Sequence, residues 1–326
     1  MRAIVCRETV GIGGLALAEM PEPLPGPGQV RIAVAAAGVN FADSLMIAGR
    51  YQERPALPFV PGLEVAGRVD AVGPGVEGLA LGQRVLAAVD GGAFAEKALA
   101  QAGDAIPLPD GIDDVTAAGF AIAYGTAIGA LDWRAGLKPG ERLLVHGAAG
   151  GVGLTSVEVG RAMGAEVVAT ARGEEKLALA RRHGAAQAVD SDAPDLAARL
   201  KELSGGRGFD VVLDPVGGAV FDASLRAVAW GGRILLVGFA SGKVPQIPAN
   251  ILLVKNAAAI GFYWGSYRRH DPARLRKSFA TLFGWLAEGR LRPHVSHVLP
   301  LDRTAEAIGL LLDRRSTGKV VIKIFD

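Results

Sequence analysis

A short glycine-rich segment constrains the fold of this chain more than any other part of its sequence. Residues 143–145 are apolar and predict a buried strand, and a helix-like segment, residues 154–163, follows the glycines. Gly150 and Gly151 allow the backbone to approach a pyrophosphate, and Gly153 allows the helix to pack closely against the strand. The segment predicts a dinucleotide-binding turn whose contacts come from Ala149, Gly150, Gly151, Val152 and Gly153.

The residues that follow favour this interpretation over its alternative. That alternative is a tight strand-to-helix turn without a ligand, because Ala148 stands where the usual first glycine would be. Segments 166–170, 209–213 and 232–237 read as strands, and residues 174–183 read as a helix. Alternation of this kind predicts a Rossmann-type domain, an α/β fold with a doubly wound parallel sheet.

The remainder of the chain has a different residue pattern. The first part contains several prolines and short apolar runs bounded by glycine, which indicates a β-rich domain. Segments 274–288 and 305–312 are expected to be helices, and residues 319–324 a closing strand. We therefore expect three segments: a β-rich domain in residues 1–122, the dinucleotide-binding domain in residues 123–265, and a return to the first domain in residues 266–326.

Composition excludes several classes of protein. The chain has 326 residues, of which 50% are hydrophobic, so it can bury a sizeable core. Its 35 basic and 33 acidic residues leave a net charge of +2, which argues against a nucleic-acid partner. No apolar run is long enough to cross a membrane and no signal-peptide pattern is present, so we expect a cytoplasmic protein.

Five motifs along the chain carry a resemblance to a known family. They are residues 37–43 (AGVNFAD), 49–51 (GRY), 61–67 (PGLEVAG), 148–153 (AAGGVG) and 214–218 (DPVGG). With these motifs the chain resembles the medium-chain dehydrogenases/reductases and, among them, the zinc-free NADPH:quinone oxidoreductases that include zeta-crystallin. The resemblance covers essentially the whole length and implies a GroES-like β-rich catalytic domain beside the Rossmann-type domain.

The resemblance also bears on metal binding. Relatives that oxidise alcohols with zinc have a cysteine where Asn40 stands and a histidine where Leu63 stands. Glu64 is retained, but a single carboxylate does not make a catalytic zinc site. The only cysteine, Cys6, lies elsewhere in the sequence, so we predict no metal.

The residues after the second strand of the dinucleotide unit favour NADPH over NADH. NAD-binding sites usually carry an acidic residue there, whereas this chain has Arg172 followed by Lys176. Positive charge suits the adenosine 2′-phosphate of NADPH. The resemblance implies Lys176 and Arg314 as ligands of that phosphate, with Ser191 where related reductases have a tyrosine.

The resemblance further implies how the reaction is arranged. Thr126 and the strand end formed by Gly238, Phe239 and Ala240 are expected to line the nicotinamide. Without a metal or flavin, direct hydride transfer from the nicotinamide to an electrophilic acceptor is the simplest chemistry.

Three residues of the β-rich domain are candidates for the acceptor site. Asn40 would donate a hydrogen bond to a carbonyl group, and Tyr51 would act as a hydrogen-bond donor or a proton source. Asp43 would shape the site, although it could simply cap the segment that follows it. A half-buried tyrosine that anchors its loop is the alternative for Tyr51.

Three functions remain open at this stage. The first is NADPH-dependent quinone reduction, and the second is reduction of activated C=C bonds in enones, 2-haloacrylates or enoyl thioesters. The third is a sensing or structural role based on NADPH binding.

The apolar segments 247–255 and 258–264 are expected to leave a strand near the sheet edge. A second copy of the chain could cover this strand, so we predict a homodimer, which substitutions at Ile260 or Phe262 would test.

Overall fold

The computed structural model describes residues 1–325 and contains two compact units. Unit 1 comprises Met1–Ile122 and the C-terminal segment that starts at Pro293. Unit 2 comprises Ala123–Arg292. The predicted combination of a parallel-sheet domain and a separate β-rich domain is confirmed.

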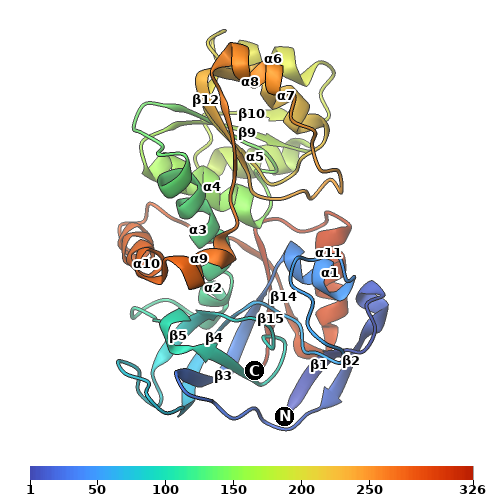
Figure 1. Ribbon diagram of the computed structural model, residues 1–326, viewed down its shortest axis with the longest axis vertical. Coiled ribbons are helices and arrows are strands. Elements are labelled where there is room, and N and C mark those ends of the chain that lie inside the picture. The colour runs from blue at the N-terminus through green and yellow to red at the C-terminus, as the bar shows by residue number, and fades with distance from the viewer. Residues whose placement is uncertain (326) are drawn as a thin grey trace. The chain divides into compact units, whose positions relative to one another are not determined.

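Unit 1 is built on a mainly antiparallel sheet. Its strands follow the order β14-β15-β3-β4-β5-β7, and β6 also pairs with β3. Their bounds are β3 Gln29–Val39, β4 Glu64–Val72, β5 Arg84–Ala88, β6 Lys97–Gln101, β7 Ala105–Pro107, β14 Val295–Pro300 and β15 Lys319–Lys323. The C-terminal strand β15 lies beside β3, far from it in sequence, as Figure 1 shows. A separate ribbon is formed by β1 (Arg2–Cys6) and β2 (Leu15–Glu19).

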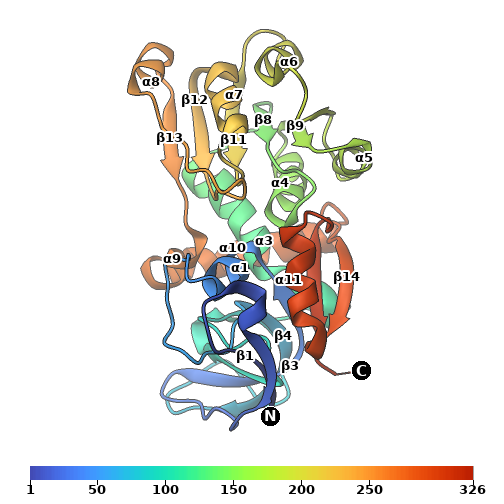
Figure 2. The same cartoon turned by 90° about the vertical axis from the view of Figure 1, so that its right-hand side faces the viewer.

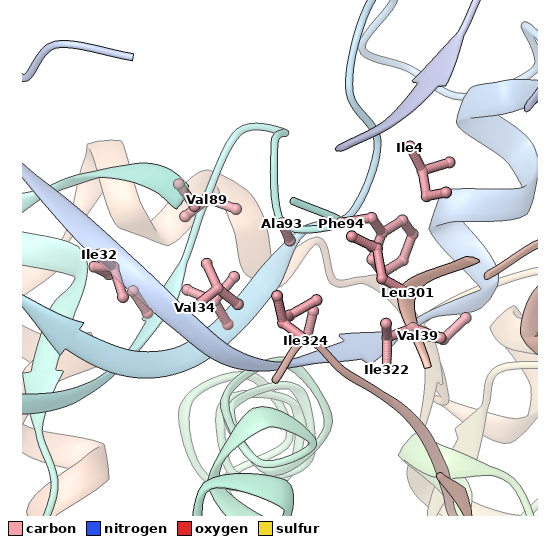
Figure 3. Packing of buried hydrophobic residues seen from close by; sticks show 14 of the residues in the cluster. Ile4, Ile32, Val34, Val39, Val89, Ala93, Phe94, Leu301, Ile322 and Ile324 are labelled. Atoms are coloured by element: carbon pink, nitrogen blue, oxygen red, sulfur yellow. The ribbon is translucent and has the colours of Figure 1, made fainter. Parts of the chain in front are cut away.

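The core of unit 1 depends on alternation along these strands. Val30, Ile32 and Val34 of β3 are all fully buried, because alternate side chains of a strand face the same side of the sheet. They belong to a cluster that includes residues from both ends of the chain, such as Ile4 and Ile322 (Figure 3). The helices of this unit are short: α1 Phe41–Ile47, α2 Asp114–Ala118 and α11 Thr304–Leu312.

Unit 2 contains a six-stranded sheet in the order β10-β9-β8-β11-β12-β13, and every pair of neighbours is parallel. The bounds are β8 Arg142–Val145, β9 Glu166–Ala171, β10 Gln187–Asp190, β11 Phe209–Asp214, β12 Val228–Leu236 and β13 Ala258–Gly261. Figure 2 shows β13, β12, β11, β8 and β9 side by side in this order. The chain enters this sheet at β8, adds β9 and β10 on one side of it, and then adds β11, β12 and β13 on the other side. A switch point of the topology therefore lies between β8 and β11.

Helices cover both faces of this sheet. On one face, Leu144 and Val212 form a cluster with residues of α6 (Leu196–Leu203) and α7 (Ala219–Ala227). On the other face lies α4 (Gly151–Ala162), where a Cβ on Gly160 would meet Leu143 Cδ2 at 2.3 Å. Because Leu143 and Leu144 point to opposite faces, this packing makes the sheet doubly wound. The other helices are α3 Ala121–Ile128, α5 Glu174–Arg182, α8 Ala249–Lys255, α9 Trp264–His270 and α10 Pro272–Ala287.

Two segments differ from the expectations. Residues 266–292, which the sequence analysis assigned to the first domain, belong to unit 2. The reason is aromatic packing, because the ring of Tyr267 in α9 packs in a tilted arrangement against Trp133 and Phe262, with ring centroids 4.8 Å and 5.5 Å apart. The apolar segment 247–255 is not a strand but contains the helix α8. Among residues 1–325, no helix has the length and apolar character needed to cross a membrane.

Candidate functional site

The glycine turn after β8 has the close approach that its sequence predicts. Gly147 adopts a φ of 58° and makes the reversal, so the absence of a glycine at position 148 is compensated one residue earlier. The backbone N–H of Gly150 donates to the carbonyl of Gly147 at 2.9 Å. A Cβ on Gly153 would lie 2.1 Å from that carbonyl oxygen, so only glycine fits where α4 crosses the turn.

Two strand ends meet at the switch point of the sheet. The Asp214 carboxylate, at the end of β11, accepts the backbone N–H groups of Val216 at 2.8 Å and Gly217 at 2.9 Å. Val216 in turn faces the glycine turn, since a Cβ on Gly147 would meet its Cγ2 at 3.0 Å. This edge of the sheet is where doubly wound folds bind ligands.

The predicted nicotinamide segment joins the same edge. Ala240 donates its N–H to the carbonyl of Pro215 at 3.1 Å, and Ser241 donates to Val216 at 2.9 Å. Gly238 approaches the Pro215 carbonyl so closely that a Cβ there would lie 3.2 Å from its oxygen. Phe239 is 39% exposed. The structure therefore brings Gly238, Phe239 and Ala240 against the segment that follows β11, while Thr126 lies buried on α3.

A buried histidine that the sequence analysis left without a specific role supports the start of the turn. His146 is fully buried and contacts Thr170 Oγ1 through Nδ1 at 2.8 Å and Ser224 Oγ through Nε2 at 2.6 Å. Since the Ser224 hydroxyl donates to Val220, Nε2 carries the proton and Nδ1 accepts from Thr170. Burial lowers the pKa of His146, so the ring stays neutral and links β8 to β9 and α7.

The predicted 2′-phosphate residues have an acidic neighbour that the sequence analysis missed. Arg172 follows β9, and Asp192 follows the adjacent strand β10; their side chains form a two-point ion pair, with Arg172 Nε 2.6 Å from Asp192 Oδ2. Ser191 lies beside them and donates its N–H to the carbonyl of Ala171 at 2.9 Å. Lys176 is on α5, in the same unit. Arg314 belongs to unit 1, where it follows α11 with a φ of 57°.

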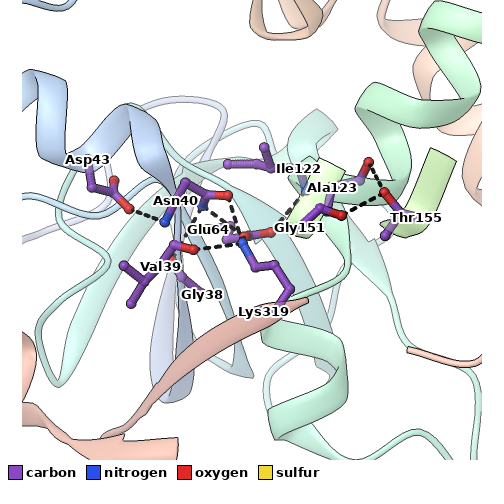
Figure 4. A network of polar contacts seen from close by, with 10 residues as sticks. All are labelled: Gly38, Val39, Asn40, Asp43, Glu64, Ile122, Ala123, Gly151, Thr155 and Lys319. Atoms are coloured by element: carbon purple, nitrogen blue, oxygen red, sulfur yellow. Dashed lines mark hydrogen bonds and ion pairs between the residues drawn. The ribbon is translucent and has the colours of Figure 1, made fainter. Parts of the chain in front are cut away.

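In unit 1, Asn40 stands at the centre of a buried polar network (Figure 4). Its Nδ2 donates to Glu64 Oε1 at 2.9 Å, and its Oδ1 accepts from Lys319 Nζ at 2.7 Å. Lys319 Nζ also donates to Glu64 Oε1 at 2.7 Å, while Glu64 Oε2 accepts the N–H of Ile122 at 2.9 Å. Gly38 is required beside this network because a Cβ there would lie 2.5 Å from Glu64 Oε1.

Asp43 is the second predicted residue that the structure brings to this network. Its side chain is fully buried, and its Oδ2 accepts the backbone N–H of Asn40 at 2.7 Å. Burial raises the pKa of Asp43 to about 7, although the Asn40 N–H and the charge of Lys319 act in the opposite direction. Its Oδ1 has no hydrogen-bond partner among residues 1–325. The group can therefore change its protonation state near neutral pH.

Tyr51 lies in the segment after α1 and is partly buried. Its role at an acceptor stays a prediction.

Two charged groups of this network were not identified as site residues from the sequence. Glu64 was considered only as a remnant of a zinc site, and Lys319 only as part of a closing strand. A lysine at the start of an alternating strand usually faces solvent. Its burial follows from the pairing of β15 with β3, which places Val320 opposite Val39 and so sets Lys319 beside Asn40.

Comparisons with known proteins agree with this architecture. A family model described as "Alcohol dehydrogenase GroES-like domain" matches residues 26–110, and one described as "Zinc-binding dehydrogenase" matches residues 151–284. The quinone oxidoreductase-like protein 2 homolog of Nematostella vectensis is 44% identical over 300 residues, which are 91% of this chain and 82% of that protein. The chain belongs to the quinone oxidoreductase family of medium-chain dehydrogenases/reductases.

Solved structures of similar proteins superpose over almost the whole chain. A mycobacterial protein in complex with NADPH is 35% identical with a TM-score of 0.94, covering 99% of this chain and 100% of its own. The Escherichia coli quinone oxidoreductase in complex with NADPH is 29% identical with a TM-score of 0.93, again covering 99% and 100%. The predicted family is confirmed.

The name of the second family model raises the question of zinc. At the positions where zinc-dependent relatives have cysteine and histidine, this chain has Asn40 and the buried, apolar Leu63. The remaining donor, Glu64, is already bound by the ammonium of Lys319. Residues 1–325 contain no group of three or more His, Cys, Asp or Glu side chains able to hold a metal ion. The donor set does not fit a catalytic zinc.

Proposed function

We propose that this protein is a zinc-independent, NADPH-dependent quinone oxidoreductase. The observation that carries the proposal is the network of Asn40, Glu64 and Lys319, in which a lysine ammonium neutralises the one carboxylate that a metal would need. Membership of the quinone oxidoreductase family and the NADPH complexes of two relatives support it. The acceptor is a small molecule with an electrophilic carbonyl system.

The glycine turn is the proposed pyrophosphate site. The N–H groups at the start of α4 have no partners within the helix, and Gly150 leaves room for a phosphate to approach them. Ala149, Gly151, Val152 and Gly153 complete this contact. The Asp214–Gly217 segment and residues 238–240 form the adjoining part of the same edge, where the nicotinamide is proposed to lie with Thr126.

Discrimination for NADPH is assigned to Arg172, Lys176, Ser191 and Arg314. Arg172 already pairs with Asp192, so its guanidinium must exchange this carboxylate for the 2′-phosphate when NADPH binds. Both side chains of the pair are more than half exposed, and such pairs contribute about 0–1 kcal/mol, so this exchange costs little. The arginine therefore remains available to a dianionic phosphate.

The bound NADPH supplies a hydride from C4 of its nicotinamide. In the proposed reaction, reduction of a quinone to a hydroquinone takes this hydride and one proton. Asn40 donates an N–H to the acceptor carbonyl and stabilises the negative charge that develops on its oxygen. Tyr51 supplies a hydrogen bond or the proton, and Asp43 lies beside Asn40 as a carboxyl group able to hold a proton near neutral pH.

A homodimer is proposed as the state of assembly. Strand β13 lies at one end of the parallel sheet, and its Ile260 is partly exposed. An open strand edge of this kind is suited to pairing with a second copy. Phe262, however, is 6% exposed and packs against Trp133 and Tyr267, so it belongs to the core of unit 2. The cytoplasmic location inferred from the sequence stays a prediction.

The first test is oxidation of NADPH and NADH by the metal-stripped protein. The acceptors are 1,4-benzoquinone, 9,10-phenanthrenequinone, an enone and crotonyl-CoA. Quinone turnover with a preference for NADPH is the expected result. Turnover of only the enone or the thioester would assign the protein to the reductases of activated C=C bonds. NADPH binding without turnover would favour a sensing or structural role, and loss of quinone turnover on metal removal would refute zinc independence.

A further inference from the structure

Lys319 is a buried charge of unit 1 whose hydrogen bonds are satisfied within the protein, and the proposed reaction gives it no part. Its side chain is 7% exposed, and its ammonium donates to three acceptors: the Val39 carbonyl at 2.9 Å, Asn40 Oδ1 at 2.7 Å and Glu64 Oε1 at 2.7 Å. Three protons meet three acceptors, so no donor of this lysine is left over for a substrate. Lys319 therefore gives no hydrogen bond to a substrate, and the groups that it binds are the ones through which its contacts can act.

One of these groups is the side-chain amide of Asn40, and its orientation decides which atom it presents to a partner. An asparagine presents either its oxygen or its nitrogen to a partner, depending on a half-turn of the amide. Here the oxygen of Asn40 faces the Lys319 ammonium and the nitrogen faces the Glu64 carboxylate. A half-turn would set N–H against ammonium and oxygen against carboxylate, so both charged neighbours enforce the same orientation.

In this orientation, Asn40 can offer a further ligand only a hydrogen-bond donor. One Nδ2 hydrogen donates to Glu64, and the only other acceptor described for Nδ2 in residues 1–325 is the Gly38 carbonyl at 3.5 Å, the far limit of a hydrogen bond. The second hydrogen is thus the group that Asn40 can give to a carbonyl. The positive charge at Oδ1 also polarises the amide and strengthens this donor.

We propose that Lys319 is a positioning residue of the acceptor site, which holds the Asn40 amide by its oxygen so that an N–H faces the carbonyl to be reduced. This inference rests on the proposed role of Asn40 as the donor to the acceptor. It adds a reason for the buried ion pair with Glu64, which holds the ammonium next to the amide. Buried ion pairs are weak contributors to stability, so a role in orientation accounts for the pair better than a role in folding.

The test removes both charges at once. Lys319→Met alone would leave Glu64 buried and unpaired, so it is combined with Glu64→Gln. The neutral amide introduced by Glu64→Gln pairs with Asn40 in either amide orientation, and Asn40 loses its defined direction. We expect kcat/KM for a quinone to fall on the order of tenfold, the equivalent of one hydrogen bond. The matched control, Lys97→Met with Asp70→Asn, removes a lysine and its acidic partner from the same sheet and is expected to retain activity.

A double-mutant cycle with Asn40→Ala decides whether Lys319 acts through the amide. In the Asn40→Ala background, the combination of Lys319→Met with Glu64→Gln, here called the charge-free variant, is expected to change kcat/KM by less than about twofold. The same tenfold loss in that background would overturn the inference, since Lys319 would then act without Asn40. If Asn40→Ala itself left kcat/KM unchanged, the proposed donor role of Asn40 would fail, and this inference with it.

A spectroscopic measurement complements the kinetics and does not depend on turnover. The side-chain amide signals of Asn40 in a ¹⁵N–¹H spectrum are identified by their loss in Asn40→Ala. One sharp, well-separated pair is expected in the parent protein, and a broadened or doubled pair in the charge-free variant. Identical signals in both proteins would overturn the inference, while unchanged NADPH affinity of every variant verifies that unit 2 is folded.

Discussion

Replacement of Gly153 by alanine tests the close approach on which the dinucleotide turn depends. The added Cβ would lie 2.1 Å from the Gly147 carbonyl oxygen, whereas real Cβ atoms essentially never come closer than 3.0 Å. The turn and α4 must therefore separate by about 1 Å in a packed interior that yields little. Overpacking of this kind costs about 3 kcal/mol, since the obstacle is backbone.

The higher helix propensity of alanine partly offsets this loss of stability. Gly153 is in the first turn of α4, where alanine is favoured over glycine by up to about 1 kcal/mol. The net expectation for Gly153→Ala is a loss of about 2 kcal/mol. For a unit of this size, that loss corresponds to a fall in Tm of roughly 4–8 °C. We also expect NADPH to bind about tenfold more weakly, because the displaced turn no longer fits the pyrophosphate.

Gly150→Ala is the matched control, with the same substitution three residues earlier. Its Cβ would lie 3.4 Å from the nearest atom, the Gly147 oxygen, and its φ of −83° suits any residue. Alanine is a poorer N-cap than glycine, so we expect a stability loss below about 1 kcal/mol. The methyl group would nevertheless occupy the space proposed for the phosphate and weaken NADPH binding.

Thermal unfolding and NADPH titration of both variants separate the two effects. The expected pattern is weakened NADPH binding in both variants, with a clear fall in Tm only for Gly153→Ala. A Gly153→Ala protein with unchanged Tm and unchanged NADPH affinity would refute the argument from close approach.

Three further predictions follow from the charges and edges of the two units. Arg172→Ala is expected to weaken NADPH binding about tenfold without changing NADH binding, and Asp192→Asn is expected to strengthen NADPH binding a few-fold. Both affinities are measured by titration, and equal effects on the two nucleotides would contradict a phosphate contact. Because the folded state raises the pKa of Asp43 above its ordinary value, the native state holds this proton more tightly, so stability falls as pH rises from about 4 to about 7, by up to about 4 kcal/mol. Asp43→Asn should flatten this dependence in denaturant unfolding, and an unaltered pH profile would count against it. Ile260→Lys is expected to halve the solution mass by preventing the pairing of β13 with a second copy, and an unchanged mass would rule out this interface. Phe262→Lys is expected instead to lower Tm, because Phe262 is a core residue.

The parts of the molecule that local sequence could predict are those governed by short-range physics. The glycine turn, the helix after it and the strand before it follow from backbone freedom and from apolar periodicity within about ten residues. The segment 247–255 shows the limit of such reasoning. A short apolar run is compatible with a strand or a helix, and the helix α8 forms where a strand was predicted.

The domain to which residues 266–292 belong was equally beyond local sequence reasoning. Their amphipathic pattern predicts a helix but not the surface on which it packs. That surface is decided by aromatic contacts such as Tyr267 with Trp133, which are distant in sequence. Asp192 was missed for a similar reason, because its partner Arg172 follows a neighbouring strand.

The sequence by itself determined the two kinds of domain and the dinucleotide turn, since each depends on residue types at fixed local spacing, and it named Asn40 only as a candidate. Only the tertiary structure decided what Asn40 can do. Its amide is oriented by Glu64, 24 positions away, and by Lys319, 279 positions away. Hydrogen bonds are directional and act over about 3 Å, so the register of β15 against β3 had to be known before these groups could be paired.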